Sequence, residues 1–258
     1  MVEQHRNTVS IRRIREACRT CSLNDLCLPV ALDAPDVDAL DRIVQRRRPL
    51  ARGEVLFNTG DRFDAIYAVR TGALKSMTIK EDGEEQITTF HLPGELLGLD
   101  AISFREHPST ASALDTSSLC EIPFAELEDL AERIPGLNRQ LLRIMSKEIF
   151  NDQEMLHAMA RRSAEERLAI LLLSLSHRFA RRGLSATRFR LPMARHELSN
   201  YLGLAPETMS RLFRRFVENG WISVSGKELS LEDVDALRAL TGSPSAIMQK
   251  DIGSEKHH

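Results

Sequence analysis

Four cysteines are the residues whose type and spacing most readily suggest chemistry. Cys18, Cys21 and Cys27 lie close together near the start of the sequence, and Cys120 lies far along the chain. Because thiolates bind soft metals, four cysteines match either a zinc site or a [4Fe–4S] cluster. The spacing is that of neither a ferredoxin nor a zinc ribbon, and a single cysteine in an apolar stretch, such as Cys120, often belongs to a core. The residues alone leave the choice open.

A second group of polar residues, toward the C-terminal end, has the chemistry to recognise DNA bases. Glu207, Ser210 and Arg211 stand at i, i+3 and i+4, on one face of an expected helix. Arginine can bind O6 and N7 of guanine, glutamate can accept from the amino group of cytosine, and serine can do either. The alternative is an exposed ion pair between Glu207 and Arg211. The residues expected to contact bases or phosphates are Glu207, Thr208, Ser210, Arg211, Arg214 and Arg215.

The elements expected around this group form a winged helix-turn-helix. Gly203 suits the tight turn between two helices, Pro206 suits the first position of the second, and Gly220 ends it. The second helix of such a unit inserts its N-terminal end into the major groove of DNA. The expected elements are a helix over about 194–202, a helix over about 206–219, and wing strands over 221–224 and 229–231.

The sequence between these groups predicts an antiparallel β-roll and a long helix. Residues from about 37 to 134 have short apolar runs separated by glycines at 53, 60, 72, 83 and 94, and Gly83 is expected to give a hairpin turn over 81–84 its positive φ. From Pro135 the apolar residues change to a helical period of 3.5, which is typical of a coiled-coil seam. The seam residues are Leu142, Met145, Ile149, Asp152, Leu156 and Met159.

The seam predicts a homodimer, although an amphipathic helix packed on its own domain has a similar pattern. Asp152 would face its twin in a symmetric pair, and like charges oppose association, so the dimer is expected to be marginal. A further helix is expected over about 164–181, and a short acidic helix near the end.

Composition and charge favour a cytoplasmic DNA-binding protein. The whole chain has a net charge of −2, but residues 161–227 contain 13 Lys/Arg and 5 Asp/Glu, a local net of +8, which leaves −10 for the remainder. No apolar run reaches the roughly 20 residues needed to cross a bilayer, and the start lacks a signal peptide. We therefore expect no membrane partner, and a reducing compartment in which cysteines are ligands rather than disulfides. Hydrolase, P-loop, zinc-protease and dinucleotide-binding motifs are absent, so no catalytic residue and no enzyme activity are expected.

Several motifs resemble the CRP/FNR (cyclic-AMP receptor protein) family of transcription regulators. The segment HELSNYLGL, followed by the E-x-x-S-R of Glu207–Arg211, is similar to the DNA reader of the FNR branch, and ACRTCSLNDLCLP and LCEIPFAELEDL look like its cluster-binding segments. The resemblance covers residues 11 to about 242. It implies an oxygen-sensing regulator, mainly an activator, in which Cys18, Cys21, Cys27 and Cys120 hold one [4Fe–4S] cluster.

The resemblance also implies partners. A dimer stabilised by the intact cluster would bind double-stranded DNA at inverted repeats with TTGAT-like half-sites. RNA polymerase would touch a loop of the roll at Thr71, Glu81, Asp82, Gly83 and Glu84. Cyclic-nucleotide binding is not expected, because the stretch 107–111 lacks the arginine that meets the phosphate in nucleotide-binding members. A regulator of the same family with a structural zinc or a small ligand, and no redox cluster, is the alternative.

Taken together, the patterns and the resemblance predict an α+β protein. Its parts are a cysteine-rich cluster-binding segment over 1–30, a jelly-roll β-roll like that of cyclic-nucleotide-binding domains over 31–134, a dimerisation helix over 135–162, a winged helix-turn-helix over 163–242 and a flexible tail over 243–258.

Overall fold

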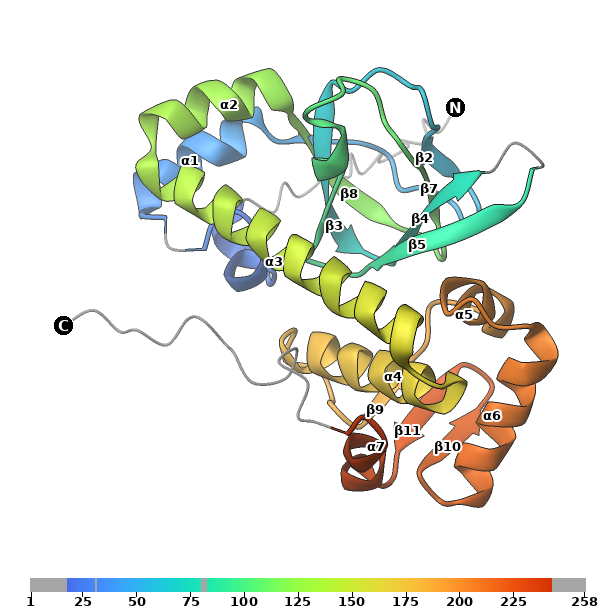
Figure 1. Ribbon diagram of the computed structural model, residues 1–258. Coiled ribbons are helices and arrows are strands. Elements are labelled where there is room, and N and C mark those ends of the chain that lie inside the picture. Colours follow the sequence, from blue (N-terminus) through green and yellow to red (C-terminus); the bar gives the residue numbers. More distant parts are fainter. Residues whose placement is uncertain (1–17, 31, 80–82, 243–258) are drawn as a thin grey trace, which may run out of the picture.

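The computed structural model describes residues 18–30, 32–79 and 83–242 (Figure 1). The predicted tail over 243–258, the first part of the cysteine segment, and Glu81 and Asp82 lie outside these residues. Within them, an N-terminal β-roll is joined by one long helix to a C-terminal domain of helices and a small sheet.

Two four-stranded antiparallel sheets form the roll, as predicted. One sheet has the order β1 (Gln45–Arg46), β8 (Ser118–Pro123), β3 (Ala65–Thr71) and β6 (Leu96–Leu97). The other has the order β2 (Val55–Phe57), β7 (Thr110–Ala113), β4 (Leu74–Ile79) and β5 (Glu85–His91). Apolar side chains from both sheets, among them Phe57, Tyr67 and Leu74, are buried in one cluster.

The glycines that separate the strands take the backbone conformation expected of them. All five have positive φ, including Gly83 at 83°, which confirms the φ predicted for that residue, while the rest of the predicted turn lies partly outside the described residues. Gly72 is the tightest of them, because a Cβ there would lie 2.5 Å from the carbonyl oxygen of Thr116. A glycine is therefore required at this turn between β3 and β4 for space as well as for φ.

Two helices flank the roll where only strands are predicted. Helix α1 (Ala34–Ile43) precedes the first strand, and α2 (Phe124–Arg133) follows the last. The prediction of a strand-like pattern over the whole of 37–134 is wrong at both ends. Local capping decides the first case: the Asp33 side chain accepts from the Asp36 N–H at 3.1 Å, and a proline occupies the first turn.

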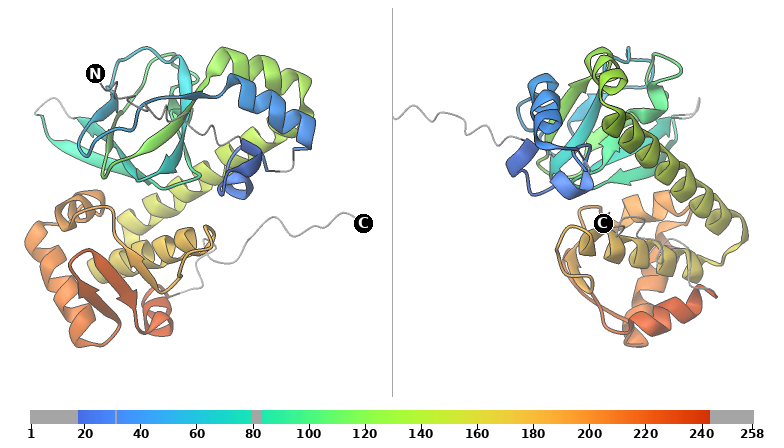
Figure 2. Two further views of the ribbon diagram at one scale, coloured as in Figure 1. Left: turned by 180° about the vertical axis from the view of Figure 1, so that it is seen from behind. Right: turned by 90° about the vertical axis from the view of Figure 1, so that its left-hand side faces the viewer.

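Helix α3 (Pro135–Arg161) crosses from the roll to the C-terminal domain, as Figure 2 shows in two further views. This helix agrees closely with the predicted one, because a proline stands at its start and the apolar period continues along it except at Asp152. Helix α4 (Ala164–Ala180) follows at once, since Ser163 and Glu166 form a capping box that ends one helix and begins the next.

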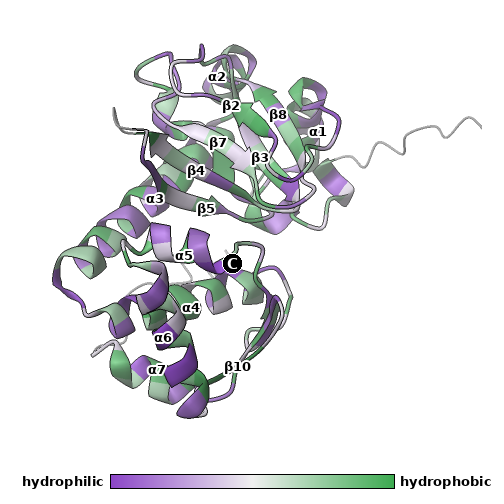
Figure 3. Ribbon diagram, turned by 90° about the vertical axis from the view of Figure 1, so that its right-hand side faces the viewer, coloured by the Kyte–Doolittle hydropathy of each residue, from purple (hydrophilic) through white to green (hydrophobic). Residues whose placement is uncertain are grey.

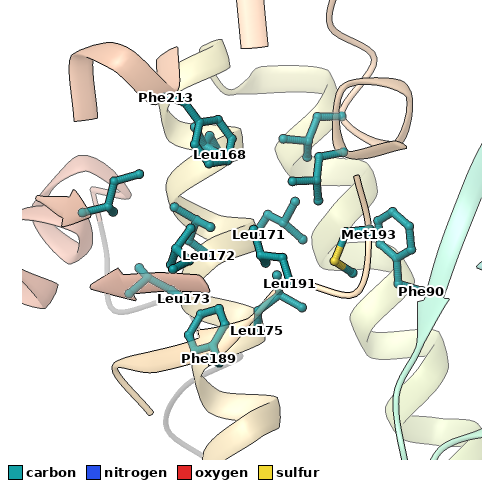
Figure 4. Close-up of a cluster of buried hydrophobic side chains, with 14 of the residues drawn as sticks. Phe90, Leu168, Leu171, Leu172, Leu173, Leu175, Phe189, Leu191, Met193 and Phe213 are labelled. Atoms are coloured by element: carbon teal, nitrogen blue, oxygen red, sulfur yellow. The ribbon is translucent and has the colours of Figure 1, made fainter. Parts of the chain in front are cut away.

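The C-terminal domain has the predicted winged helix-turn-helix arrangement. Its elements are β9 (Arg188–Arg190), α5 (Arg195–Tyr201), α6 (Pro206–Glu218), β10 (Ile222–Ser225), β11 (Glu228–Leu231) and α7 (Val234–Leu240). Strand β9 pairs with β11 and is an addition to the two predicted wing strands. Figure 4 shows the apolar side chains of α4 that hold these elements together.

Polar and apolar residues alternate along the outer helices, as the hydropathy colours of Figure 3 show. Across the three described stretches of chain, none of the helices combines the length and the apolar character that a bilayer crossing requires.

Candidate DNA-binding surface and cysteine pocket

Helix α6 separates a buried apolar face from an exposed polar one. Met209, Leu212, Phe213 and Phe216 are buried against the rest of the C-terminal domain. Exposed on the opposite side are Glu207, Ser210, Arg211, Arg214 and Arg215, while Thr208 is half-buried. The face predicted to recognise bases is thus held outward by the packing of the other face, as a major-groove reader requires.

Contacts within this face leave the base-reading groups available to a ligand. The guanidinium of Arg211 lies 3.5 Å from the Thr208 hydroxyl, and Ser210 donates to the Pro206 carbonyl at 3.0 Å. Among the described residues no ion pair joins Glu207 to Arg211, so the alternative of a surface ion pair does not account for these two side chains. Arg215, in contrast, pairs with Glu165 on α4. Its predicted role as a phosphate contact stays a prediction.

Helix α6 begins without a side-chain cap. Its N-cap residue, Ala205, has extended backbone angles (φ −63°, ψ 144°), and no side chain accepts a hydrogen bond from the first turn. A serine at 205 could accept from a free N–H there, so Ala205→Ser is expected to raise the free energy of unfolding by about 1 kcal/mol. Thermal unfolding of the DNA-free protein measures this. The matched control is Ala239→Ser in the exposed last turn of α7, where serine has no N-cap role and is expected to destabilise slightly. Equal effects of the two changes would contradict the capping account.

All four cysteines line one pocket beside the roll. Cys18 begins a single helical turn (η1, Cys18–Thr20), Cys21 and Cys27 flank a second turn (η2, Asn24–Leu26), and Cys120 lies in the middle of β8. The pocket is partly open to solvent and is otherwise lined largely by apolar side chains, such as Leu28, Leu40 and Ile122. Cys120, which spacing alone could not group with the others, is brought to them by the fold.

Three thiols of this pocket, those of Cys18, Cys27 and Cys120, have raised pKa values, which favour their neutral form. Burial and a hydrogen bond to Asp41 raise the pKa of Cys18, and burial raises the pKa of Cys27 to about 12. Burial also raises the pKa of Cys120, although Arg46 and Arg70 oppose this shift. A metal must therefore displace protons on binding.

A metal site can be assessed from the donors alone. Thiolates in a pocket lined largely by apolar side chains suit zinc or iron–sulfur chemistry, and the set of residues fits either group. In the described part of the chain, no three His, Cys, Asp or Glu side chains already stand in an arrangement that would hold a single metal ion.

A hydrogen bond ties the cysteine loop to helix α3. The Gln140 side-chain amide donates to the Cys27 carbonyl at 3.3 Å, and Gln140 is itself buried. On the same side of the helix, Leu137, Leu141 and Ile144 pack into the core that includes Leu28 and Cys120. This face of α3 therefore contacts the roll and the cysteine loop.

A neighbouring face of α3 carries exposed apolar side chains. Leu142, Ile149 and Leu156 recur every seven residues and are 59%, 58% and 69% exposed. Asp152 is also exposed, Met145 is half-buried, and Met159 packs partly against the core of the C-terminal domain. Exposed apolar side chains at this spacing are typical of coiled-coil surfaces, and the dimer interface stays a prediction.

The residues predicted to touch RNA polymerase lie in two separate places. Thr71 ends β3 and its hydroxyl lies 2.6 Å from that of Ser118, whereas Gly83 and Glu84 are exposed at the other end of β4. The structure does not bring the two places together into one surface.

Gly94 packs the roll against the cysteine loop. Its φ is +88°, and a Cβ there would lie 2.9 Å from the Cβ of Leu26. Gly94→Ala is therefore expected to lower the free energy of unfolding by about 1–3 kcal/mol, through backbone strain and displacement of the loop. The control is Gly60→Ala, which has a similar φ of +84° but nothing within 4 Å. Denaturant unfolding of both variants checks this, and equal losses would show that Leu26 contributes nothing.

Comparisons with known proteins agree with this architecture. The cyclic nucleotide-binding domain model matches residues 47–134, and the Crp-like helix-turn-helix model matches residues 166–240. The chain is 51% identical over 236 residues to transcriptional activator protein FnrA of Stutzerimonas stutzeri. This match covers 91% of this chain and 97% of the relative. It is 48% identical over 237 residues to the fumarate and nitrate reduction regulatory protein of Salmonella typhimurium. That match covers 90% of this chain and 95% of the relative. The solved structure of FixK2 from Bradyrhizobium japonicum has a TM-score of 0.71 and 28% identity, and the match covers 78% of this chain and 98% of that one.

A roll of this type joined to a winged helix-turn-helix with an exposed polar face defines a DNA-binding transcription regulator and not an enzyme. The chain belongs to the CRP/FNR family, in its FNR branch, as the motifs predict.

Proposed function

We propose that the protein is a cytoplasmic, oxygen-responsive transcription regulator that holds a [4Fe–4S] cluster on Cys18, Cys21, Cys27 and Cys120. The observation that carries this proposal is the convergence of all four cysteines on one pocket, three from the N-terminal loop and one from β8. When bound, such a cluster supplies a reaction with oxygen. The names of the relatives, which include an anaerobic regulatory protein of Haemophilus influenzae, agree with this role.

The neighbours of the pocket suit an anionic group. Four thiolates around a 2+ cluster core carry a net charge of −2, and cations nearby would offset it. Arg70 lines the pocket, and Arg46 of β1 lies opposite Cys120 in the β1–β8 pair. Asp41 accepts from both the Cys18 N–H and Arg46, so it orients one ligand and one cation together, while its own negative charge opposes the thiolate of Cys18. Residues of this kind orient metal ligands from outside the site.

Gln140 connects the cysteine pocket to helix α3, which carries the proposed dimer surface. With all four thiols bound, the loop that contains Cys27 is fixed, and so is the carbonyl to which Gln140 donates. Gln140 lies on α3, whose neighbouring face carries Leu142, Met145, Ile149, Asp152, Leu156 and Met159, the proposed dimer interface. A fixed loop holds α3 in position for pairing against the repulsion between the two Asp152 carboxylates. Loss of the cluster frees the loop and favours the monomer.

The dimer presents two copies of α6 to an inverted repeat with TTGAT-like half-sites. Glu207, Ser210 and Arg211 recognise bases in each half-site. Contacts with the DNA backbone are made by Thr208, Arg214 and Arg215. At such promoters the protein acts mainly as an activator, and it contacts RNA polymerase through Thr71 and the 81–84 hairpin. Each part of the chain then has one role. The cysteine segment over 1–30 binds the cluster together with Cys120 of the roll, the dimer helix joins two copies, and the domain over 163–242 binds DNA.

The metal content of protein prepared without air tests the proposal against the zinc alternative. Iron and acid-labile sulfide should each approach four atoms per chain after reconstitution, since a [4Fe–4S] cluster contains four of each. About one zinc per chain with no sulfide would instead identify a structural zinc site. A preparation that binds neither metal would show that the signal lies elsewhere.

A further inference from the structure

A buried ion-pair cluster joins the roll to the C-terminal domain. Glu95, in the turn between β5 and β6, accepts from Arg178 Nε of α4 at 3.0 Å and from Arg182 Nη2 at 2.6 Å. The two arginines also donate to backbone carbonyls of the roll, Arg178 to Phe90 and Arg182 to Pro93. The side chains of Glu95, Arg178 and Arg182 are 25%, 22% and 6% exposed. The cluster therefore lies largely out of water, where such contacts are geometrically specific.

A second contact joins helix α5 to the edge of the roll. Strand β5 is the last strand of its sheet, so its outer backbone groups have no strand partner. The Asn200 side-chain amide meets two of them: its oxygen accepts from the Ile87 N–H at 2.6 Å and its nitrogen donates to the Glu85 carbonyl at 2.6 Å. Gln86 donates to the Asn200 carbonyl at 2.8 Å. Asn200 thus occupies the place of a neighbouring strand residue.

Apolar side chains connect these two polar contacts. Ile87, Phe90 and Leu92 of the roll belong to the same buried cluster as the leucines of α4. Figure 4 shows Phe90 reaching from its strand toward Met193 of the C-terminal domain. The ring of Phe90 lies 4.9 Å from that of Tyr201, the neighbour of Asn200. The two domains share one continuous core on this side.

The charges of the ion-pair cluster are fixed at neutral pH. Burial alone would raise the pKa of Glu95, but Arg178 and Arg182, together with the Leu92 N–H, hold it at about 2. The carboxylate of Glu95 therefore stays ionised throughout the physiological pH range, so a change of pH within that range does not break the contact.

We propose that Glu95 and Asn200 are positioning residues for DNA binding, which fix the helix-turn-helix on the roll so that a dimer can engage both halves of its operator. The proposal rests on the proposed function. Two reading helices must be held about one DNA turn apart, roughly 34 Å, to bind two half-sites at once. Two further ion pairs, Lys75 with Glu197 and Asp115 with Arg190, also join the roll to the C-terminal domain. The domain follows α3 through the short step at Arg162–Ser163. A fixed domain meets the second half-site at a higher effective concentration than a loosely attached one.

Binding to one and two half-sites separates positioning from other roles. Dimeric protein prepared without air is titrated onto a duplex with the inverted repeat and onto one with a single half-site. The variants are Asn200→Ala, Glu95→Gln and the double variant. Glu128→Gln on α2, which is exposed and lies away from this interface, is the control with the same chemical change as Glu95→Gln. The double variant should bind the inverted repeat about tenfold or more weakly and the single half-site within about twofold of the parent protein.

Two further readouts distinguish positioning from misfolding. Amide exchange at Ile87 should accelerate in Asn200→Ala, because that N–H loses its acceptor, and Glu95→Asp should restore part of the lost affinity because it keeps the carboxylate. Equal losses on both duplexes, or unchanged or tighter binding to the inverted repeat, would overturn the proposal. A parent protein that binds the inverted repeat no better than a scrambled duplex would contradict the proposed operator itself, and this is seen before any variant is compared.

Discussion

Replacing Cys120 by serine is expected to give a protein that holds no cluster and stays monomeric without air. Cys120 is the one cysteine supplied by the roll, so it alone ties the N-terminal loop to β8. Loss of even an outer neighbour of a metal site costs about 10–100-fold in affinity, and loss of a ligand should cost at least as much. Iron content and size-exclusion chromatography measure the two effects.

Ser118→Ala is the matched control for this change. Ser118 lies on the same strand but bonds to Thr71 and is not part of the pocket lining. It should leave iron content and dimerisation unchanged. Full iron occupancy in Cys120→Ser would mean that Cys120 is an ordinary core cysteine, which is the alternative that its sequence leaves open.

The second large effect is expected from Arg211. If its guanidinium binds a guanine, Arg211→Ala should cost about 1–3 kcal/mol for each half-site and relax the preference at that base pair. Arg214→Ala should instead weaken binding to all sequences alike and lower the salt dependence by about one unit. Titrations against the parent operator and single-base variants, at two salt concentrations, separate these outcomes. A uniform loss in Arg211→Ala would show that it contacts phosphate and not a base.

Local sequence signals predict most of the architecture. The glycines of the roll, the proline at the start of α3 and the Gly203 turn each impose a backbone conformation that neighbours cannot override. Helices α1 and α2 were missed because each is short and lies beside strands, although Asp33 followed by a proline is a usable signal for the first.

Long-range partners are the part that sequence patterns do not reveal. Gln140, Glu95 and Asn200 each bond to a residue more than eighty positions away, and nothing in their own surroundings names that partner. A polar residue on an otherwise apolar helix face, such as Gln140 between Leu137 and Ile144, is a sequence signal for such a buried hydrogen bond. The position of Cys120 beside the N-terminal cysteines likewise depends on the fold, and only the family resemblance predicts it.

The central claim is that oxygen acts through the four cysteines on the dimer. The most direct test follows one anaerobic sample through the admission of air, with the visible spectrum, size-exclusion profile and operator binding recorded before and after. The account predicts a coloured dimer that binds the inverted repeat, then loses its colour and its operator affinity together as it becomes a monomer. A dimer that keeps its DNA affinity after the colour is lost, or a protein with no colour at the start despite reconstitution, would contradict it.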